Sequence, residues 1–435
     1  MTVTTLKQAL AAPRAALPGS AASQDVRAAA LAELGATGLP TPRREDWRYT
    51  DLKSLVDVEL DFAPDRPDRA ALDAAARALA EHGVPADAAR LVFVDGHLAP
   101  ELGTLGPTSG IEVRDLDDYW LQPETARRLR VSTAAHPLAA LNTAYAQSGA
   151  WLRVAEGARI AGELRLVLVA SGAPRRVAQP KIVVEIDRGA EITIVQHVVD
   201  AADTDGWLNV VTEVALAEDS RLSLYRLQEH RFRHAHTSLL AVELAARATA
   251  SLGLFDLGGR LVRNDIDVKL REPGAALELY GLLLAGEGQH VDDHTRIDHI
   301  APDTRSNEAF RGVIGRRGRG VFNGKVVVHR GAHGIDARQT SDNLLLSDQG
   351  EIDTKPELEI YSDDVKCSHG STVGELDAEH LFYIRSRGVD EAHAREILTT
   401  AFATTVLERI AAPHVRASVA DKVGARLRTL AEVSR

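Results

Sequence analysis

Gly157-Ala158-Arg159-Ile160 recurs as Gly189-Ala190-Glu191-Ile192 and again as Gly274-Ala275-Ala276-Leu277, and this repeat is the strongest indication of the fold. Degenerate copies begin at Asp219 and Arg247, so that successive copies start 32, 30, 28 and 27 residues apart. A small or turn-forming residue followed by an inward-pointing apolar one suits the corner of a β-solenoid coil. The repeat therefore predicts stacked coils, with either two coils or one coil plus a hairpin in each period.

The hydrophobic period changes twice along the chain. From about residue 150 to 375, short apolar or alternating runs are separated by Gly, Asp and Asn, which is typical of strands. We therefore predict a mainly β protein with three domains: an N-terminal, mostly helical domain (1–148), a β-solenoid core (149–375) and a C-terminal helical domain (376–435). A β-sandwich is the alternative, but its turn signals recur every ~8–12 residues without a longer repeat.

Local signals mark the helices. In the C-terminal domain, Asp377 is expected to cap a helix that Gly388 closes, Asp390 caps the next, and Pro413 separates it from the last. An apolar stripe on these helices either caps the solenoid end or docks another chain. It includes Ile397, Leu398, Ala401, Phe402, Val406 and Ile410. In the N-terminal domain, the first helix is expected to end at Gly35.

Composition limits the function. The chain has 435 residues, 45% of them hydrophobic, and a formal net charge of -11. An acidic balance argues against nucleic-acid binding, and no segment approaches the ~18 uncharged apolar residues of a membrane span. The single cysteine, Cys367, excludes an internal disulfide and a four-cysteine iron–sulfur cluster held by this chain alone. We therefore expect a cytoplasmic protein in a reducing compartment.

Cys367-Ser368-His369 is the most informative tripeptide. Residues i and i+2 of a strand share a face, so the thiol and the imidazole are expected side by side. Both are ligands for zinc or iron, but two ligands are too few for a closed site, and the others have to come from another chain. The alternative is structural: Cys367 and Val365 fill the solenoid interior, as free cysteines often do, and His369 merely follows.

The surroundings of Cys367 are acidic. Between Asp342 and Glu379 the chain has eleven acids and two lysines, a net charge of -9. Such a setting opposes ionisation of the thiol unless a metal cation binds, which argues against a cysteine-protease nucleophile. Gly286-Glu287-Gly288 lacks the third glycine of a nucleotide-binding loop, so any ATP is bound by another chain.

Two further polar groups precede the acidic stretch. His290, Asp292 and His294 share a face on an extended strand, and His299 follows them. That face is either a metal site or a solvated polar surface of the solenoid. Residues 309–335 carry six basic side chains and no acid, with few aromatics nearby, which favours a salt-bridged ladder or a protein interface over a nucleic-acid patch.

The C-terminal part also resembles a known family. Residues 343–370, NLLLSDQGEIDTKPELEIYSDDVKCSHG, are similar to the SufB/SufD family of iron–sulfur cluster assembly proteins. Residues 294–299, 321–325 and 381–388 fit the same family, and residues 45–52, EDWRYTDL, resemble the N-terminal signature of its SufD-like members. The resemblance covers roughly Arg27 to Ile410.

Within that family the chain is SufD-like. SufB-type members carry an additional sulfur-accepting cysteine, and the matching neighbourhood here, Ser347 to Asp353, has none. The resemblance implies a right-handed parallel β-helix between N-terminal and C-terminal helical regions, in agreement with the fold predicted from the repeat. Residues 329–334 depart from the family pattern, and we carry no role onto them.

The resemblance implies a scaffold of the SUF machinery rather than an enzyme. It implies pairing with SufB through the β-helix and binding of the ATPase SufC by the C-terminal helical domain. It also implies that His369, with Cys367 as a secondary candidate, helps to hold a nascent iron–sulfur cluster shared with SufB, and that this chain alone binds no cofactor firmly. The alternatives are a stand-alone β-helix enzyme, carbohydrate-active or an acyltransferase, and a purely structural homodimer.

Overall fold

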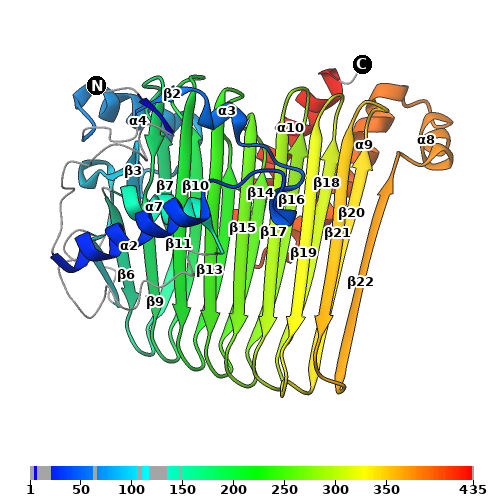
Figure 1. The fold of residues 1–435 in the computed structure, drawn as a ribbon. Helices are drawn as coiled ribbons and strands as arrows, with labels where there is room; N and C mark the ends of the chain where they lie inside the picture. Colours follow the sequence, from blue (N-terminus) through cyan, green and yellow to red (C-terminus); the bar gives the residue numbers. More distant parts are fainter. Residues whose placement is uncertain are drawn as a thin grey trace.

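Two parallel sheets wound into a β-solenoid of about eight turns form the centre of the molecule (Figure 1). The computed structural model describes residues 4–6, 21–61, 66–105, 110–116, 135–146 and 148–433. The predicted mainly β fold with helical regions at both ends is confirmed. Among the described residues, no helix combines the length and apolar character needed to cross a membrane.

The first sheet follows the order β22-β20-β18-β16-β14-β12-β10-β7-β3-β4, parallel from β22 to β3. Its strands are β3 (Arg90–Val94), β4 (His97–Leu98), β7 (Arg159–Ala170), β10 (Glu191–Asp200), β12 (Arg221–Gln228), β14 (Thr249–Asp256), β16 (Ala276–Ala285), β18 (Arg305–Ile314), β20 (Ile335–Leu345) and β22 (Val365–Gly374). The β3–β4 pair is antiparallel and forms one edge, whereas β22 forms the other.

The second sheet follows the order β21-β19-β17-β15-β13-β11-β9-β6-β5, with β8 beside β11. Its strands are β5 (Ile111–Asp115), β6 (Gly149–Val154), β8 (Arg176–Ala178), β9 (Lys181–Ile186), β11 (Gly206–Leu216), β13 (His234–Leu244), β15 (Leu261–Leu270), β17 (His290–His299), β19 (Arg319–Val328) and β21 (Glu351–Ile360). Each solenoid turn therefore contributes one strand to each sheet.

The repeat marks the same corner in five successive turns. Gly157, Gly189, Asp219, Arg247 and Gly274 all have φ between 55° and 77°, and the backbone N–H of Gly157 donates to Arg188, directly before the next corner. Positive φ is easy for glycine and strained for other residues. One period is a single coil of two long strands, so neither arrangement predicted from the period is right. Strands of about ten residues use up the whole period.

The solenoid interior is a hydrophobic core built from alternate residues of both sheets. Leu252 and Leu254 of β14 and Ile266 and Val268 of β15 are all completely buried. Each such side chain contributes roughly 1.5–3 kcal/mol on burial. Because the rise between turns is set by strand pairing, inward-facing residues stack in rows along the solenoid axis.

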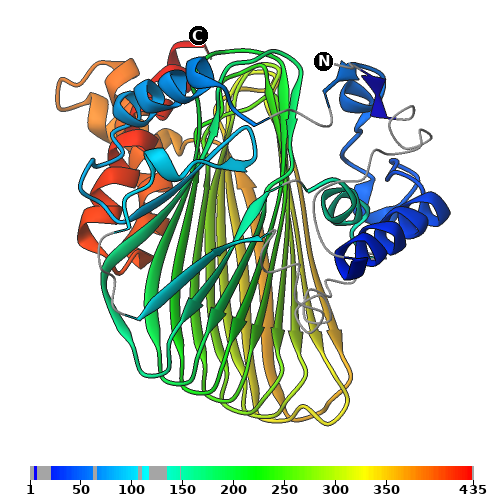
Figure 2. The ribbon, with the colours of Figure 1, turned by 90° about the vertical axis from the view of Figure 1, so that its left-hand side faces the viewer.

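Helices cover the outer faces of the two sheets (Figure 2). On the second sheet lie α2 and α7, joined by the buried Trp47 and Trp207. On the first sheet lie α4 and the C-terminal helices. The helical elements are α2 (Ala21–Thr37), η1 (Glu45–Trp47), α3 (Lys53–Val56), α4 (Arg69–Glu81), η2 (Pro100–Leu102), α7 (Pro137–Tyr145), α8 (Ala378–Arg385), α9 (Glu391–Thr404), η3 (Thr405–Arg409) and α10 (Pro413–Val433), and β1 (Thr4–Thr5) pairs with β2 (Glu59–Leu60).

Part of the C-terminal apolar stripe packs on the flank of the solenoid rather than on its end, whereas Ile397 and Ala401 of the stripe are exposed. Val406, Ile410, Val419 and Val423 are buried against the outer face of the first sheet. The expected caps are present, because the side chains of Asp377 and Asp390 accept backbone N–H groups of α8 and α9. In the N-terminal region, α2 continues through Gly35 to Thr37, since Leu34 is buried and holds the last turn in place.

Candidate functional site

β22 is the last strand of the first sheet and carries both Cys367 and His369. It pairs with β20 on one side, and among the described residues no strand pairs with its other edge. The register places Cys367 beside Ala337 and His369 beside Gln339. Ala337 and Gln339 are buried inside the solenoid, so the cysteine and the histidine continue two inward-facing rows.

The two side chains differ in exposure because the solenoid ends at this strand. Cys367 is half-buried and packs against the hydrophobic core of the solenoid. His369 is exposed. The thiol therefore contributes to packing, whereas the imidazole is available to whatever covers the open end.

The thiol of Cys367 is held in its protonated form. Burial raises the pKa of Cys367 above its ordinary value and the carboxylate of Asp336 raises it further, against a hydrogen bond with the Ala337 backbone that lowers it. The acidic stretch predicted a thiol that is hard to ionise, and the structure identifies burial as the larger cause. A metal cation that binds the sulfur reverses this balance, because it favours the thiolate.

A buried polar pair that the sequence reasoning missed lies beneath His369. Glu308 is completely buried, and its Oε2 accepts a hydrogen bond from Gln339 Nε2 at 2.5 Å. Burial raises the pKa of Glu308 to about 7, although the hydrogen bond from Gln339 lowers it. Glu308, Gln339 and His369 follow one another in register across β18, β20 and β22. Their spacing of 31 and 30 residues matches the repeat, and is the signal that could have revealed them.

Gly324 on the opposite sheet makes room for this pair. A Cβ atom at residue 324 would lie 2.1 Å from Gln339 Nε2 and 2.8 Å from the Phe322 ring. Any side chain here displaces the glutamine, so the glycine in the motif at 321–325 has a packing role next to the candidate site.

The open end of the solenoid also gathers exposed apolar side chains. Of the nine large hydrophobic side chains that are exposed in the described residues, six belong to this end. These open-end apolar residues are Ile360, Tyr361, Val373, Phe382, Tyr383 and Ile397. Helix α8, which carries Phe382 and Tyr383, has no buried residue. Exposed apolar surface of this kind is typical of a protein interface.

The basic stretch 309–335 pairs with the acidic coil that follows it. Lys325 Nζ lies 2.5 Å from a carboxylate oxygen of Glu359, and Arg319 lies 3.4 Å from Glu351 and 3.1 Å from Asp353. The predicted salt-bridged ladder is confirmed for these residues.

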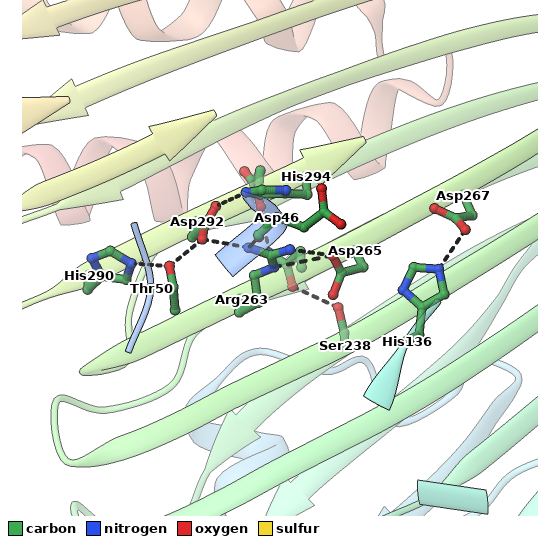
Figure 3. A network of polar contacts seen from close by, with 12 residues as sticks. Asp46, Thr50, His136, Ser238, Arg263, Asp265, Asp267, His290, Asp292 and His294 are labelled. Atoms are coloured by element: carbon green, nitrogen blue, oxygen red, sulfur yellow. Dashed lines mark hydrogen bonds and ion pairs between the residues drawn. The ribbon is translucent and has the colours of Figure 1, made fainter. Parts of the chain in front are cut away.

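The His290–Asp292–His294 group is buried under the N-terminal segment (Figure 3). Asp292 is completely inaccessible, and its carboxylate lies 2.8 Å from Arg263 Nη1 and 3.0 Å from His294 Nε2. Thr50 donates a hydrogen bond to Asp292 and lies 2.7 Å from His290 Nε2. Asp292 is therefore shielded from solvent, whereas His290 and His294 are partly exposed. The three residues are not among the possible metal-binding groups found in the described residues.

Trp47 and Arg263 add further contacts that anchor the N-terminal segment, residues 45–50, to the solenoid. The guanidinium carbon of Arg263 lies 4.4 Å from the centre of the Trp47 ring, and Arg263 Nη1 donates to the Asp46 carbonyl at 2.9 Å. Burial alone would raise the pKa of Asp292, but Arg263 and His294 hold it well below its usual range, so the carboxylate stays charged. The N-terminal motif and the histidine group thus form one structural unit.

Comparison with known proteins adds a family to this geometry. Residues 168–402 match the model described as "SUF system FeS cluster assembly, SufBD core domain", and residues 17–166 match "SufBD protein N-terminal region". The chain is 32% identical to the iron-sulfur cluster assembly protein SufD of Escherichia coli, over 91% of both chains. It is 29% identical to the SufBD family protein slr0076 of Synechocystis, over 87% of this chain and 85% of the relative. It is 32% identical to the chloroplastic protein ABCI7 of Arabidopsis thaliana, over 55% of this chain and 51% of the relative.

Proposed function

This chain belongs to the SufBD family of SUF-system iron–sulfur cluster assembly proteins, and from that premise we propose that it completes a cluster-forming site together with a SufB partner. It is a SufD-type assembly protein. The observation that carries the proposal is the position of His369: it is exposed on an unpaired edge strand, in the same inward-facing series as the half-buried Cys367.

The open end of the solenoid supports the choice of partner. β21 and β22 are the terminal strands of the two sheets, so each presents unsatisfied backbone groups that another strand can pair with. Ile360 and Val373 add apolar contact area at the same end. A SufB solenoid that continues both sheets satisfies the backbone and covers these side chains in one step.

The ligand chemistry explains why a partner is needed. His369 and Cys367 supply at most two ligands, and an iron–sulfur cluster needs more. The cluster is the cargo of the complex, and the sulfur-accepting cysteine comes from SufB. On this proposal His369 binds as a neutral imidazole, and Cys367 binds only after the metal has displaced its proton.

We assign the SufC dock to the outward side of the C-terminal helical region. Val406 and Ile410 of the apolar stripe, with Val419 and Val423 of α10, are buried against the solenoid and are not available to another chain. Phe382, Tyr383 and Ile397 remain exposed, at 74%, 59% and 49%. The ATP hydrolysis belongs to SufC on this proposal, and the chain itself acts as a scaffold.

Reconstitution of the co-expressed complex tests the proposal. SufB and SufC are co-expressed with the chain, with its His369→Ala variant, or without it, and iron and sulfide are measured per complex. We expect His369→Ala to lower cluster content severalfold while assembly and melting temperature are unchanged, because His369 is exposed and fills no core space. Cys367→Ala is expected to give a milder loss.

Other outcomes favour the alternatives. Normal cluster content in the His369→Ala complex removes this residue from the site. A chain that never purifies with SufB favours the structural homodimer, and turnover of a carbohydrate or an acyl donor without partners favours the stand-alone enzyme.

A further inference from the structure

Four buried polar side chains meet at one corner of the solenoid, far from the open end. Asp200 ends β10, His230 lies in the corner after β12, and His234 and His236 belong to the first part of β13. Asp200 and His236 are completely inaccessible, and His230 and His234 are each 4% exposed. The sequence reasoning singled out none of them.

Three of these residues are arranged around one carboxylate oxygen. Asp200 Oδ1 lies 2.6 Å from His230 Nδ1 and 4.0 Å from His234 Nδ1. The two imidazole rings stack with their centres 4.4 Å apart and their planes at 13°. Ligand atoms of all three residues lie within 4.8 Å of one another. Two imidazoles and a carboxylate are a donor set that zinc and ferrous iron prefer.

Two nitrogen atoms in this group of histidines lack a hydrogen-bond partner in the part of the chain that the structure describes. His234 Nδ1 and His236 Nε2 are buried and have no hydrogen-bond partner among the described residues. A neutral imidazole with a free lone pair is the form that binds a metal ion.

The surroundings fix the ligands, and a small cavity borders the two imidazoles. Asp200 Oδ2 accepts the backbone N–H of Arg231 at 2.7 Å, and His230 Nε2 lies 3.3 Å from His236 Nδ1. A cavity of about 20 Å³, which His230 and His234 line in part but Asp200 does not, lies beside the two imidazoles and is large enough for one water-sized particle. A wider cleft of about 880 Å³, which Lys422 of α10 also lines, reaches His230 from the surface.

We propose that Asp200, His230 and His234 form a mononuclear site for a divalent first-row transition metal ion, with His236 as a positioning residue behind His230. The ion bonds to the unpartnered His234 nitrogen and takes the place of the proton between His230 Nδ1 and Asp200, and that proton moves to His230 Nε2, which faces His236 Nδ1. This departs from the expectation that the chain alone holds no cofactor firmly. The site is independent of the cluster proposed at His369.

A neighbouring group also has its ligand atoms within 4.8 Å of one another and serves as a contrast. His82, His197 and Glu229 also lie close enough together to hold an ion. However, Lys422 Nζ lies 2.7 Å from one Glu229 oxygen and 2.9 Å from the other. The ammonium group already neutralises the carboxylate, and a metal ion there would meet its repulsion.

The test uses the isolated full-length chain, stripped with a chelator, and Co²⁺ as the probe. Because Asp200, His230 and His234 are buried, Co²⁺ is added both to the folded chain and during refolding. We expect one Co²⁺ per chain, with visible d–d absorption and a higher melting temperature, since an ion that binds only the folded state stabilises it. Asp200→Asn and His234→Gln are expected to weaken binding more than about tenfold.

Matched variants decide the outcome. His82→Gln removes an imidazole from the neighbouring group and is expected to retain full binding, as is the Cys367→Ala/His369→Ala double variant, which removes the proposed cluster ligands. If Asp200→Asn fails to fold, His234→Gln decides, because its Nδ1 makes no hydrogen bond in the described structure. Absence of stoichiometric Co²⁺ after both loading procedures overturns the proposal, as does undiminished binding in folded His234→Gln or an equal loss in His82→Gln.

Discussion

Lys422 of α10 and Glu229 at the corner after β12 form a close ion pair, with the Lys422 ammonium 2.7 and 2.9 Å from the two carboxylate oxygens. His197 Nε2 lies 2.6 Å from the same carboxylate. Burial would raise the pKa of Glu229, but hydrogen bonds from His197 and His82 and the charge of Lys422 hold it far below its ordinary value. Glu229 therefore links α4, the solenoid and the C-terminal helix through one charge.

Lys422→Met is expected to lower the free energy of unfolding by about 2 kcal/mol at pH 7, because it leaves a mostly buried carboxylate without its cation. The folded-state pKa of Glu229 is depressed, so its contribution is present above the unfolded value of 4.5 and is lost as pH falls. Urea unfolding at pH 7 and pH 4 measures both effects. Arg69→Ala, which breaks an exposed pair with Asp73, is the control and is expected to cost less than ~0.5 kcal/mol. Equal stability of the Lys422→Met and wild-type chains contradicts this account.

Trp47→Ala is expected to release residues 45–50 from the solenoid. The indole is 4% exposed and stacks on Arg263, so its loss removes about 3 kcal/mol or more and uncovers Asp292. Hydrogen exchange of this segment should accelerate, whereas exchange in β18 to β20 should not change. Arg48→Ala, in the exposed residue next to Trp47, is the control. Unchanged protection of 45–50 in Trp47→Ala rules out the anchor.

Glu308→Gln is expected to remove a pH-dependent loss of folding stability. The pKa of Glu308 is raised from 4.5 to about 7 in the folded protein, so the folded state binds the proton more tightly and stability falls as pH rises from 4.5 towards 7. At pH 8 the glutamine variant should be the more stable by up to ~3 kcal/mol, and at pH 4 the two should be equal. Melting temperatures of the two chains at pH 4 and pH 8 test this expectation. A difference that is the same at pH 4 and pH 8 assigns the effect to packing instead.

Phe382→Ser is expected to weaken capture of SufC about tenfold or more without lowering the melting temperature, because the ring is 74% exposed on a helix with no buried residue. Phe232→Ser, at the cleft near α10, removes a similarly exposed ring elsewhere and should leave capture unchanged. Equal capture by all three chains moves the SufC dock away from α8.

The isolated chain is expected to show no iron–sulfur cluster absorbance after reconstitution with iron and sulfide. It has one thiol, and that thiol has a raised pKa. A stable cluster on the purified chain would require ligands other than cysteine at most of its positions and would contradict the proposed shared site at His369.

Local signals in the sequence were sufficient for the frame of the fold. Asp219 and Arg247 were identified as corners from spacing alone, and both adopt positive φ although this costs a non-glycine residue about 1 kcal/mol. Asp303 and Gly334 occupy the next two corners and were missed, because the residues after them do not repeat the small-then-apolar pattern. At Gly35, packing outweighed the local preference for a helix end.

The candidate site was also only partly predictable from the sequence. Cys367 and His369 are two positions apart on one strand, so their shared face follows from strand geometry. Gln339 lies 30 residues upstream of His369, and the Thr50–Asp292 hydrogen bond spans 242 residues. The Gln339–His369 alignment follows from the period of the repeat, whereas the Thr50–Asp292 contact depends on how the N-terminal segment crosses the solenoid, which has no local signature in the sequence.

The free edge of β22 exposes the isolated chain to self-association. A free strand edge can template misassembly with any other exposed edge, including that of a second copy. The segment between Asp342 and Glu379 has a net charge of -9, which Arg319 and Lys325 offset in part, and the remaining acidic charge repels a second copy within a screening length of about 8 Å at physiological ionic strength. High salt should therefore promote self-association of the lone chain. On the proposed pairing with SufB, the partner covers this edge, so the unpaired chain is expected to be the species that aggregates when it is made in excess.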